Sequence, residues 1–135
     1  GYANALGGKG LRIDPSLIVH GDFSRQSGRE QAAALFAAKP TAIFASNDEM
    51  AAGVIDAANA AGISVPRDIS VVGFDNSYFS RFLIPPLTTV AFNFDLQSRL
   101  TFQFLFEHIE NPDIEPHQHV LLPELIVRHS TRRLA

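Results

Sequence analysis

The stretches TAIFASNDEM, at residues 41–50, and ISVVGFDN, at residues 69–76, decide the fold of this chain. Each contains a mainly apolar run, which is typical of a strand covered on both faces in a parallel sheet. Polar residues follow each run at once, and after the first run they lead into an alanine-rich segment that Gly62 closes. This order predicts a helix over 48–61, and a buried strand followed by a helix is the repeating unit of an α/β fold.

The sequence on either side continues the alternation. Residues 17–19 form a short aliphatic run between Pro15 and Gly21, which predicts another strand. The Ser-x-x-Glu spacing that begins at Ser27 is typical of a helix start. Further strands are expected at 88–92, 119–122 and 125–127, and further helices at 2–9, 27–38 and 95–110. The whole pattern predicts an α/β fold of three layers with a Rossmann-like parallel sheet.

Composition limits the classes of function. The chain has 135 residues, 46% of them hydrophobic, which is enough for one compact domain. Its net charge is −3 and it has no cysteine. The charge gives this segment no general attraction to nucleic acid or to an acidic membrane, and the absence of cysteine excludes disulfides and thiolate metal sites. No apolar run reaches the roughly 18 residues of a membrane-spanning helix.

Candidate binding residues follow three of the expected strands. In open parallel sheets, ligands bind beyond the carboxyl ends of the strands, and Phe23, Asn47 and Asp75 stand at those places. An aromatic face, an amide and a carboxylate together suit a neutral polyhydroxylated or heterocyclic ligand, and they do not suit phosphate. A structural interpretation stays open, because Asn and Asp after a strand are also common helix caps and turn formers, and Phe23 could belong to the core.

Motifs for other chemistry are missing or weak. The sequence contains no Gly-x-Gly-x-x-Gly, no phosphate-binding loop and no Gly-x-Ser-x-Gly, so we expect neither a cofactor nor a serine hydrolase. His117 and His119 are spaced to share one face of a strand near a loop. Without a third ligand they are expected to be a surface pair and not a metal site.

Several ordered motifs resemble the sensor domain of the LacI/GalR family of bacterial transcription regulators. They are GDFS at 21–24, SNDEMAAG at 46–53, VP at 65–66, DISVVGFDN at 68–76, PLTTV at 86–90 and RHS at 128–130. The resemblance covers essentially the whole chain. It implies a periplasmic-binding-protein-like fold with two similar α/β lobes and the ligand between them. Residues 1–91 and 122–135 would form the carboxy-terminal lobe, and residues 92–121 would form the crossover and part of the amino-terminal lobe.

The resemblance also implies roles for particular residues. Phe23 matches the aromatic residue that packs on the effector, Asn47 and Asp75 match polar residues that bond to it, and Phe94 matches a further position that lines the pocket. Dimer contacts would involve the helix around 51–58 and the loop around 78–83. The segment 95–110, which is apolar nearly all round and should be buried on more than one side, would pack on the amino-terminal lobe.

The function implied is that of an effector sensor and not an enzyme. The intact regulator would be a cytoplasmic homodimer that binds a sugar or a nucleobase-like molecule, and it would contact DNA through a helix-turn-helix domain that this chain does not contain. Two alternatives remain. One is a periplasmic sugar-binding protein, which shares the two-lobe fold. The other is an α/β enzyme that uses Asp75 or Asp48 as a general base.

Overall fold

The computed structural model describes residues 1–134. Its sheet has four strands in the order β1 (Ala42–Phe44), β2 (Ser70–Phe74), β3 (Thr88–Ala91) and β4 (Glu124–Ile126). The first three strands are parallel, and β4 pairs with β3 in the antiparallel direction. The α/β class and the parallel pairing of the central strands are confirmed, with an antiparallel strand added at one edge.

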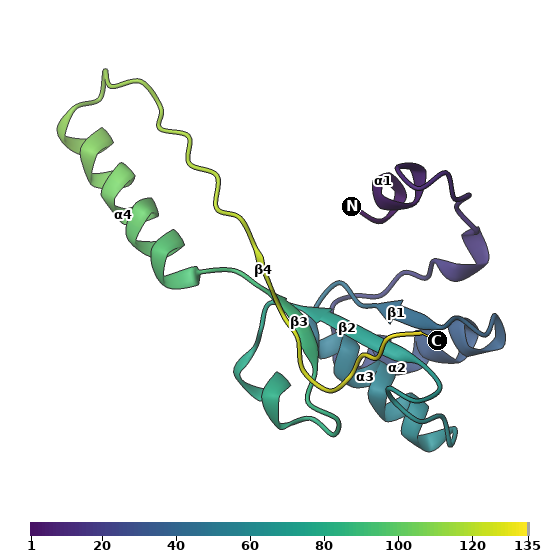
Figure 1. Cartoon of the computed structure of the whole chain (residues 1–135). Coiled ribbons are helices and arrows are strands. Elements are labelled where there is room, and N and C mark those ends of the chain that lie inside the picture. The colour runs from purple at the N-terminus through teal and green to yellow at the C-terminus, as the bar shows by residue number, and fades with distance from the viewer. Residues whose placement is uncertain (135) are drawn as a thin grey trace.

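Four α-helices accompany the sheet in the described part of the chain: α1 (Tyr2–Gly7), α2 (Arg25–Ala37), α3 (Asp48–Ala60) and α4 (Phe94–Glu110). Short 3-10 helices η1 (Pro15–Leu17) and η2 (Tyr78–Phe82) lie in the connections. Figure 1 shows α2 and α3 together beneath the sheet, while α1 stands apart from it on the other side. No residue of α1 is buried. The predicted helix bounds agree with these to within a few residues.

The core lies between the sheet and the helices α2 and α3. Its buried members come from both helices, from β1 and β2, and from the loop before β3; they include Ala32, Leu35, Ile43, Val54, Ile55, Val71 and Leu87. Gly28 and Gly53 lie where the two helices cross. A Cβ atom on Gly53 would come within 2.0 Å of the Arg25 carbonyl oxygen, and one on Gly28 within 2.2 Å of the Met50 carbonyl oxygen. The backbones of α2 and α3 are therefore in direct contact at this crossing.

The strand predicted at 17–19 is not formed. Asp14 accepts a hydrogen bond from the Ser16 backbone amide at 2.9 Å, and Pro15 occupies the first turn of η1, so the local sequence begins a 3-10 turn. Ile18 has extended backbone angles but pairs with no strand. As a result β1 is an edge strand.

The prediction that residues 41–45 are covered on both faces is also wrong. Ile43 and Ala45 are buried, whereas Ala42 is exposed and Phe44 is 56% exposed. Residues of α1 and of the segment 17–19 line a pocket with Ala42 and Phe44 and do not pack closely on them, so the second face of β1 is only partly covered. Its uniform apolarity does not correspond to burial on both sides.

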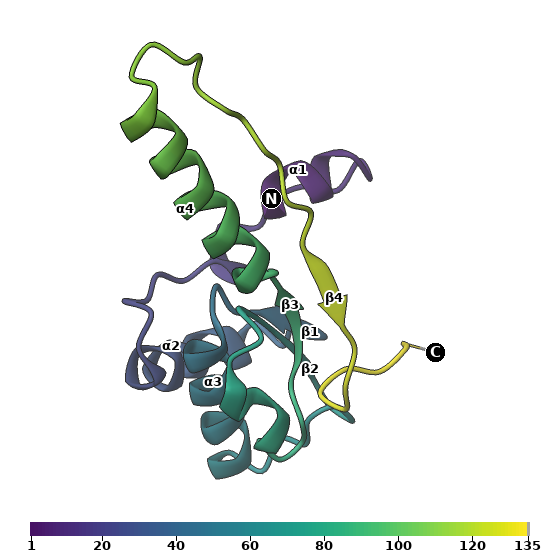
Figure 2. The same cartoon turned by 90° about the vertical axis from the view of Figure 1, so that its left-hand side faces the viewer.

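Helix α4 and the segment that follows it extend away from the sheet. Figures 1 and 2 both show α4 projecting from the end of β3, with residues 111–123 returning in an extended course to β4. No residue of α4 is buried, so the expectation that it is buried on more than one side is wrong in this chain. The strand expected at 119–122 is also absent, because that stretch has no neighbour to pair with; only Glu124–Ile126 reaches β3.

Candidate functional site

The predicted site residues lie at one end of the parallel sheet. Asn47 follows β1 and Asp75 follows β2, and these strands are adjacent and parallel, with Phe44 in register with Val72. The carboxyl ends of the strands therefore meet along a single edge, as the sequence predicted.

Phe23 and Asn47 are joined directly. The Asn47 side-chain amide donates a hydrogen bond from Nδ2 to the Phe23 carbonyl oxygen at 2.8 Å. Phe23 has a backbone φ of 68°, which lies in the left-handed region, and the residue is 64% exposed. The interpretation of Phe23 as a core residue is therefore wrong, and its ring is available to a ligand.

Asn47 is also the amino-terminal cap of α3. Its Oδ1 accepts a hydrogen bond from the Met50 backbone amide at 2.8 Å, as helix caps do. Both polar atoms of the side chain therefore already have a protein partner. One Nδ2 hydrogen and one Oδ1 lone pair remain for a ligand, so capping and binding are compatible at this position.

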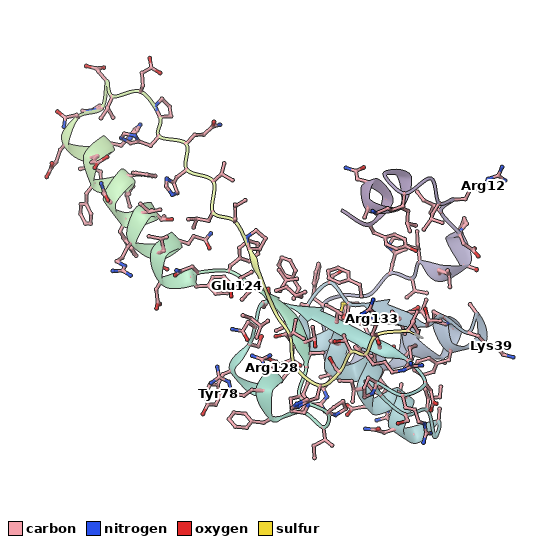
Figure 3. The ribbon with its side chains drawn as sticks, viewed as in Figure 1. Arg12, Lys39, Tyr78, Glu124, Arg128 and Arg133 are labelled. Atoms are coloured by element: carbon pink, nitrogen blue, oxygen red, sulfur yellow. The ribbon has the colours of Figure 1, made fainter. Side chains whose placement is uncertain are left out.

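Asp75 begins a strained turn. Asp75 and Asn76 have φ values of 105° and 54°, which residues other than glycine rarely adopt. The amide of Asp75 donates to the Val90 carbonyl oxygen at 2.8 Å, which continues the pairing of β2 with β3. Figure 3 labels Arg128, whose guanidinium donates to Asn76 Oδ1 at 2.6 Å. The turn is thus held by hydrogen bonds to β3 through Val90 and to the segment after β4 through Arg128.

The environment of Asp75 favours its protonated form. Desolvation by burial raises the pKa of Asp75, and the nearby charge of Asp48 raises it further. A desolvated carboxylate has few other groups that compete with a ligand for its oxygens. A ligand that donates hydrogen bonds to the Asp75 carboxylate stabilises its ionised form.

A cavity of about 540 Å³ opens between the end of the sheet and α4. It has the size of a small-molecule site. Its lining residues come from the ends of β2 and β3, from α4 and from the returning segment; they are Asp75, Phe92, Phe94, Gln97, Leu100, Thr101, Phe104, His117, His119 and Leu121. The cavity brings Asp75 and Phe94 together. Phe23 and Asn47 lie at the same sheet edge but do not line this cavity.

Three polar or aromatic residues of α4 were not predicted from the sequence as site residues. Gln97, Thr101 and Phe104 line the cavity together with Phe94. Their spacing of three, four and three residues places them on one helix face, and this is a signal that the sequence carried. It was obscured because the helix is apolar nearly all round.

His117 and His119 lie on the returning segment at the cavity wall. His117 contacts Glu107 of α4, with 2.9 Å between Nε2 and Oε2, and its ring stacks on Phe104. Within residues 1–134 no group of three or more His, Cys, Asp or Glu side chains is placed to hold a metal ion. In the same part of the chain, no helix combines the length and apolarity that crossing a bilayer would require.

The two segments expected at a dimer contact differ in exposure. Most of helix α3 over 51–58 is buried against α2 and the sheet, and only Asp56 and Ala57 are partly exposed, so this helix offers little surface to a partner. The loop around η2 is different. Tyr78 is 74% exposed and Ile84 is 84% exposed, and Figure 3 shows Tyr78 at the outer edge of the molecule.

Comparisons with known proteins agree with this architecture. The model of the periplasmic binding protein-like domain family matches residues 1–131. The chain is 41% identical over 135 residues to the HTH-type transcriptional regulator DegA of Bacillus subtilis. The aligned region covers 99% of this chain and 40% of the length of DegA, so the chain spans less than half of that relative. Among solved structures, the complex of the transcriptional regulator CelR with cellobiose has a TM-score of 0.90 and 34% identity, covering 96% of this chain and 40% of that one.

A LacI family transcriptional regulator from Enterococcus faecium with bound ribose has a TM-score of 0.91 and 30% identity, covering 99% of this chain and 50% of the other. The match to the family model, the regulator sequences and the regulator structures all concern the same fold over nearly the whole chain. The chain therefore belongs to the periplasmic binding protein-like domain family, in the form found in the sensor domains of LacI/GalR-type transcription regulators.

Proposed function

We propose that this chain is part of the effector-binding domain of a transcription regulator, and that it holds a small neutral molecule rich in hydroxyl or amine groups at the carboxyl ends of β1, β2 and β3. The observation that carries the proposal is the cavity that Asp75 shares with Phe94. A carboxylate that accepts two hydrogen bonds beside an aromatic face is the combination that sugar-like and heterocyclic ligands require.

Phe23 and Asn47 complete the proposed site from the β1 side. The exposed Phe23 ring covers an apolar face of the ligand, and Asn47 offers its remaining donor and acceptor. The solved relatives that hold cellobiose and ribose support a sugar as the ligand. The desolvated Asp75 with Asp48 nearby disfavours an anionic ligand, because a third negative charge would be repelled.

The division into lobes is part of the proposal. Residues 1–91 and, among the described residues, 122–134 form the carboxy-terminal lobe, and residues 92–121 form the crossover and part of the second lobe; residue 135, which the sequence also assigned to the first lobe, lies outside the described residues. The projection of α4 and its return from the sheet supports this division. A ligand between two lobes binds their open and closed arrangements unequally, which shifts the populations of the two states and so transmits a signal.

The whole protein is proposed to be a cytoplasmic homodimer that contacts DNA through a helix-turn-helix domain outside this chain. The relatives in sequence, which include HTH-type regulators and repressors, support this part. The exposed loop around η2 supports a partner contact there. An enzyme that uses Asp48 as a base is disfavoured by the structure, because Asp48 is fully buried and both of its oxygens accept protein hydrogen bonds.

A thermal-shift screen of the full-length protein tests the proposal. Ribose, cellobiose and adenine are added separately at millimolar concentration, and a ligand of the site raises the unfolding temperature because it binds only the folded state. Recovery of the ligand unchanged after incubation distinguishes a sensor from an enzyme. If no sugar or nucleobase stabilises the protein, the proposed ligand class is wrong.

A further inference from the structure

A buried carboxylate lies directly beneath the turn that carries Asp75. Asp48 stands in the first turn of α3 and has no exposed surface. Its Oδ1 accepts a hydrogen bond from the Thr89 hydroxyl, and its Oδ2 accepts one from the Ser77 backbone amide at 2.7 Å. No salt bridge in residues 1–134 includes it. Burying a carboxylate costs free energy unless it is well bonded, so this arrangement calls for a specific role.

The neighbouring residues leave room for that carboxylate. A Cβ atom on Gly73 would lie 2.3 Å from Asp48 Oδ1 and 2.8 Å from Leu87 Cδ2. Only glycine at this position of β2 lets the Asp48 side chain reach across to β3. The buried Thr89 hydroxyl then meets it from the other side.

The same groups hold the strained turn after β2. The amide of Asn76 donates to Thr89 Oγ1 at 3.3 Å, and the next amide, of Ser77, donates to Asp48. Thr89 therefore accepts from the turn and donates to Asp48 through one hydroxyl. Two consecutive residues with positive φ are strained, and they persist only where the surroundings fix them.

We propose that Asp48 and Thr89 are positioning residues for Asp75: they hold the turn at residues 75–77 so that the Asp75 carboxyl faces the cavity. This inference rests on the proposed function in so far as Asp75 contacts the effector. The sequence motifs that resemble the LacI/GalR family contain Asp48 and Thr89, but the proposed function gives neither of them a contact with ligand.

The chain offers a matched set of variants to test the proposal in the full-length protein. Thr89→Val keeps the shape of the side chain and removes its hydroxyl, whereas Thr89→Ser keeps the hydroxyl. Thr88→Val is the control, because Thr88 is equally buried and its hydroxyl bonds to Thr131 and to the Arg128 amide, away from Asp48. Adjacent residues of a strand point to opposite faces.

The first measurement is amide hydrogen exchange by NMR, which needs no ligand. In Thr89→Val the amides of Asn76 and Ser77 should exchange at least about tenfold faster than in the unmodified protein, relative to the Ala45 amide, which reports opening of the sheet. Thr89→Ser should restore slow exchange, and Thr88→Val should change the three amides equally. The proposal is overturned if Thr89→Val affects Asn76 and Ser77 no more than Ala45.

The second measurement is the affinity for whichever of ribose, cellobiose or adenine stabilises the unmodified protein. Thr89→Val should weaken binding about tenfold, the size expected for the loss of one well-placed buried hydrogen bond, and Thr89→Ser should restore it. Equal affinity of Thr89→Val and the unmodified protein would overturn the positioning role. If none of the three compounds binds the unmodified protein, that result counts against the proposed ligand class, and the exchange experiment still decides whether Asp48 and Thr89 hold the turn.

Discussion

The Asn47 side-chain amide donates a hydrogen bond to the Phe23 carbonyl oxygen across 2.8 Å, while its own oxygen caps α3. One side chain thus starts the helix after β1 and holds the turn that exposes the Phe23 ring. The residue whose carbonyl oxygen accepts this bond, Phe23, has a left-handed backbone φ of 68°. Asn47 therefore has two structural roles at the edge of the sheet: it caps α3 and it bonds to the turn that contains Phe23.

Two substitutions of Asn47 should separate these tasks. Asn47→Asp keeps an oxygen to cap α3 but loses the Nδ2 donor that bonds to Phe23 and that the proposed site offers to the effector, so it should weaken effector binding while keeping the helix cap. Asn47→Ala loses both contacts, and the missing cap should lower the free energy of unfolding by about 1 kcal/mol. Urea unfolding and calorimetric titration measure the two effects. Equal effector affinity of Asn47→Asp and the unmodified protein would show that neither the Phe23 contact nor a direct hydrogen bond from Asn47 Nδ2 contributes to binding.

Effector binding should depend on pH through Asp75. Because desolvation and the charge of Asp48 raise the pKa of Asp75, the carboxyl should take up its proton at a higher pH than an ordinary aspartate. The protonated form accepts fewer hydrogen bonds, so affinity for a neutral hydroxylated effector should fall as the solution is acidified through that pKa. Calorimetry over a series of buffers measures this. In Asp75→Asn, which cannot titrate, the weaker residual affinity should show no such fall.

The same shift has an opposite consequence for folding. A carboxyl group whose pKa is higher in the folded protein binds its proton more tightly there than in the unfolded chain. Its contribution to stability is therefore fully present below the unfolded pKa and is lost as the pH rises through the folded pKa. Removal of the charge in Asp75→Asn should raise stability at neutral pH, which chemical unfolding would detect. A loss of stability would contradict the assigned direction of the pKa shift.

The sequence predicted the parallel part of the fold because local signals and tertiary packing agree there. The apolar run at 69–74 and the helix that begins at Asp48 both contribute to the core. The sequence patterns gave wrong predictions where strand formation and strand direction depend on a neighbouring strand. Residues 17–19 have the composition of a strand but no neighbour to bond with, and β4 is antiparallel because the chain returns to β3 after α4.

The placement of the candidate residues was predicted in part. Asn47 and Asp75 follow adjacent parallel strands as expected, whereas Phe23, which was expected after a strand that is not formed, lies beside Asn47 through the hydrogen bond to its carbonyl oxygen. Asp48 and Thr89 were not assigned a role in binding, because their importance depends on contacts between residues 41 positions apart. Gln97 and Thr101 were missed because a helix that is apolar on several sides gives no clear indication of which face lines a cavity.

The crossing of α2 and α3 should be intolerant of any side chain. Gly53→Ala places a Cβ atom against the Arg25 carbonyl and the Arg29 amide, which are backbone atoms that cannot rotate away. The substitution should lower the free energy of unfolding by about 1–3 kcal/mol, as overpacking does. Gly7→Ala, where the added atom meets nothing within 4 Å, is the control in urea unfolding. Similar stability of the two variants would refute the close approach of the helices.

The 135-residue chain should associate with itself through α4. Four of its exposed apolar residues are spaced at three, one and three positions and form a stripe on one side of the helix: Phe102, Leu105, Phe106 and Ile109. A stripe of this kind drives association when nothing covers it. The double substitution Phe102→Lys with Phe106→Lys should reduce the sedimentation coefficient toward that of a monomer without changing stability, because neither residue is in the core. A monomeric unmodified chain at tens of micromolar would contradict the prediction.

The central claim is that Asp75 accepts hydrogen bonds from a small effector at the end of the sheet. Calorimetric titration of the full-length protein with the effector found by screening tests it, using the unmodified protein and Asp75→Ala, with unfolding temperatures measured on both. We predict that Asp75→Ala remains folded and binds about 10- to 100-fold more weakly, the loss expected for hydrogen bonds to a charged group. Unchanged affinity in a folded Asp75→Ala would contradict the account.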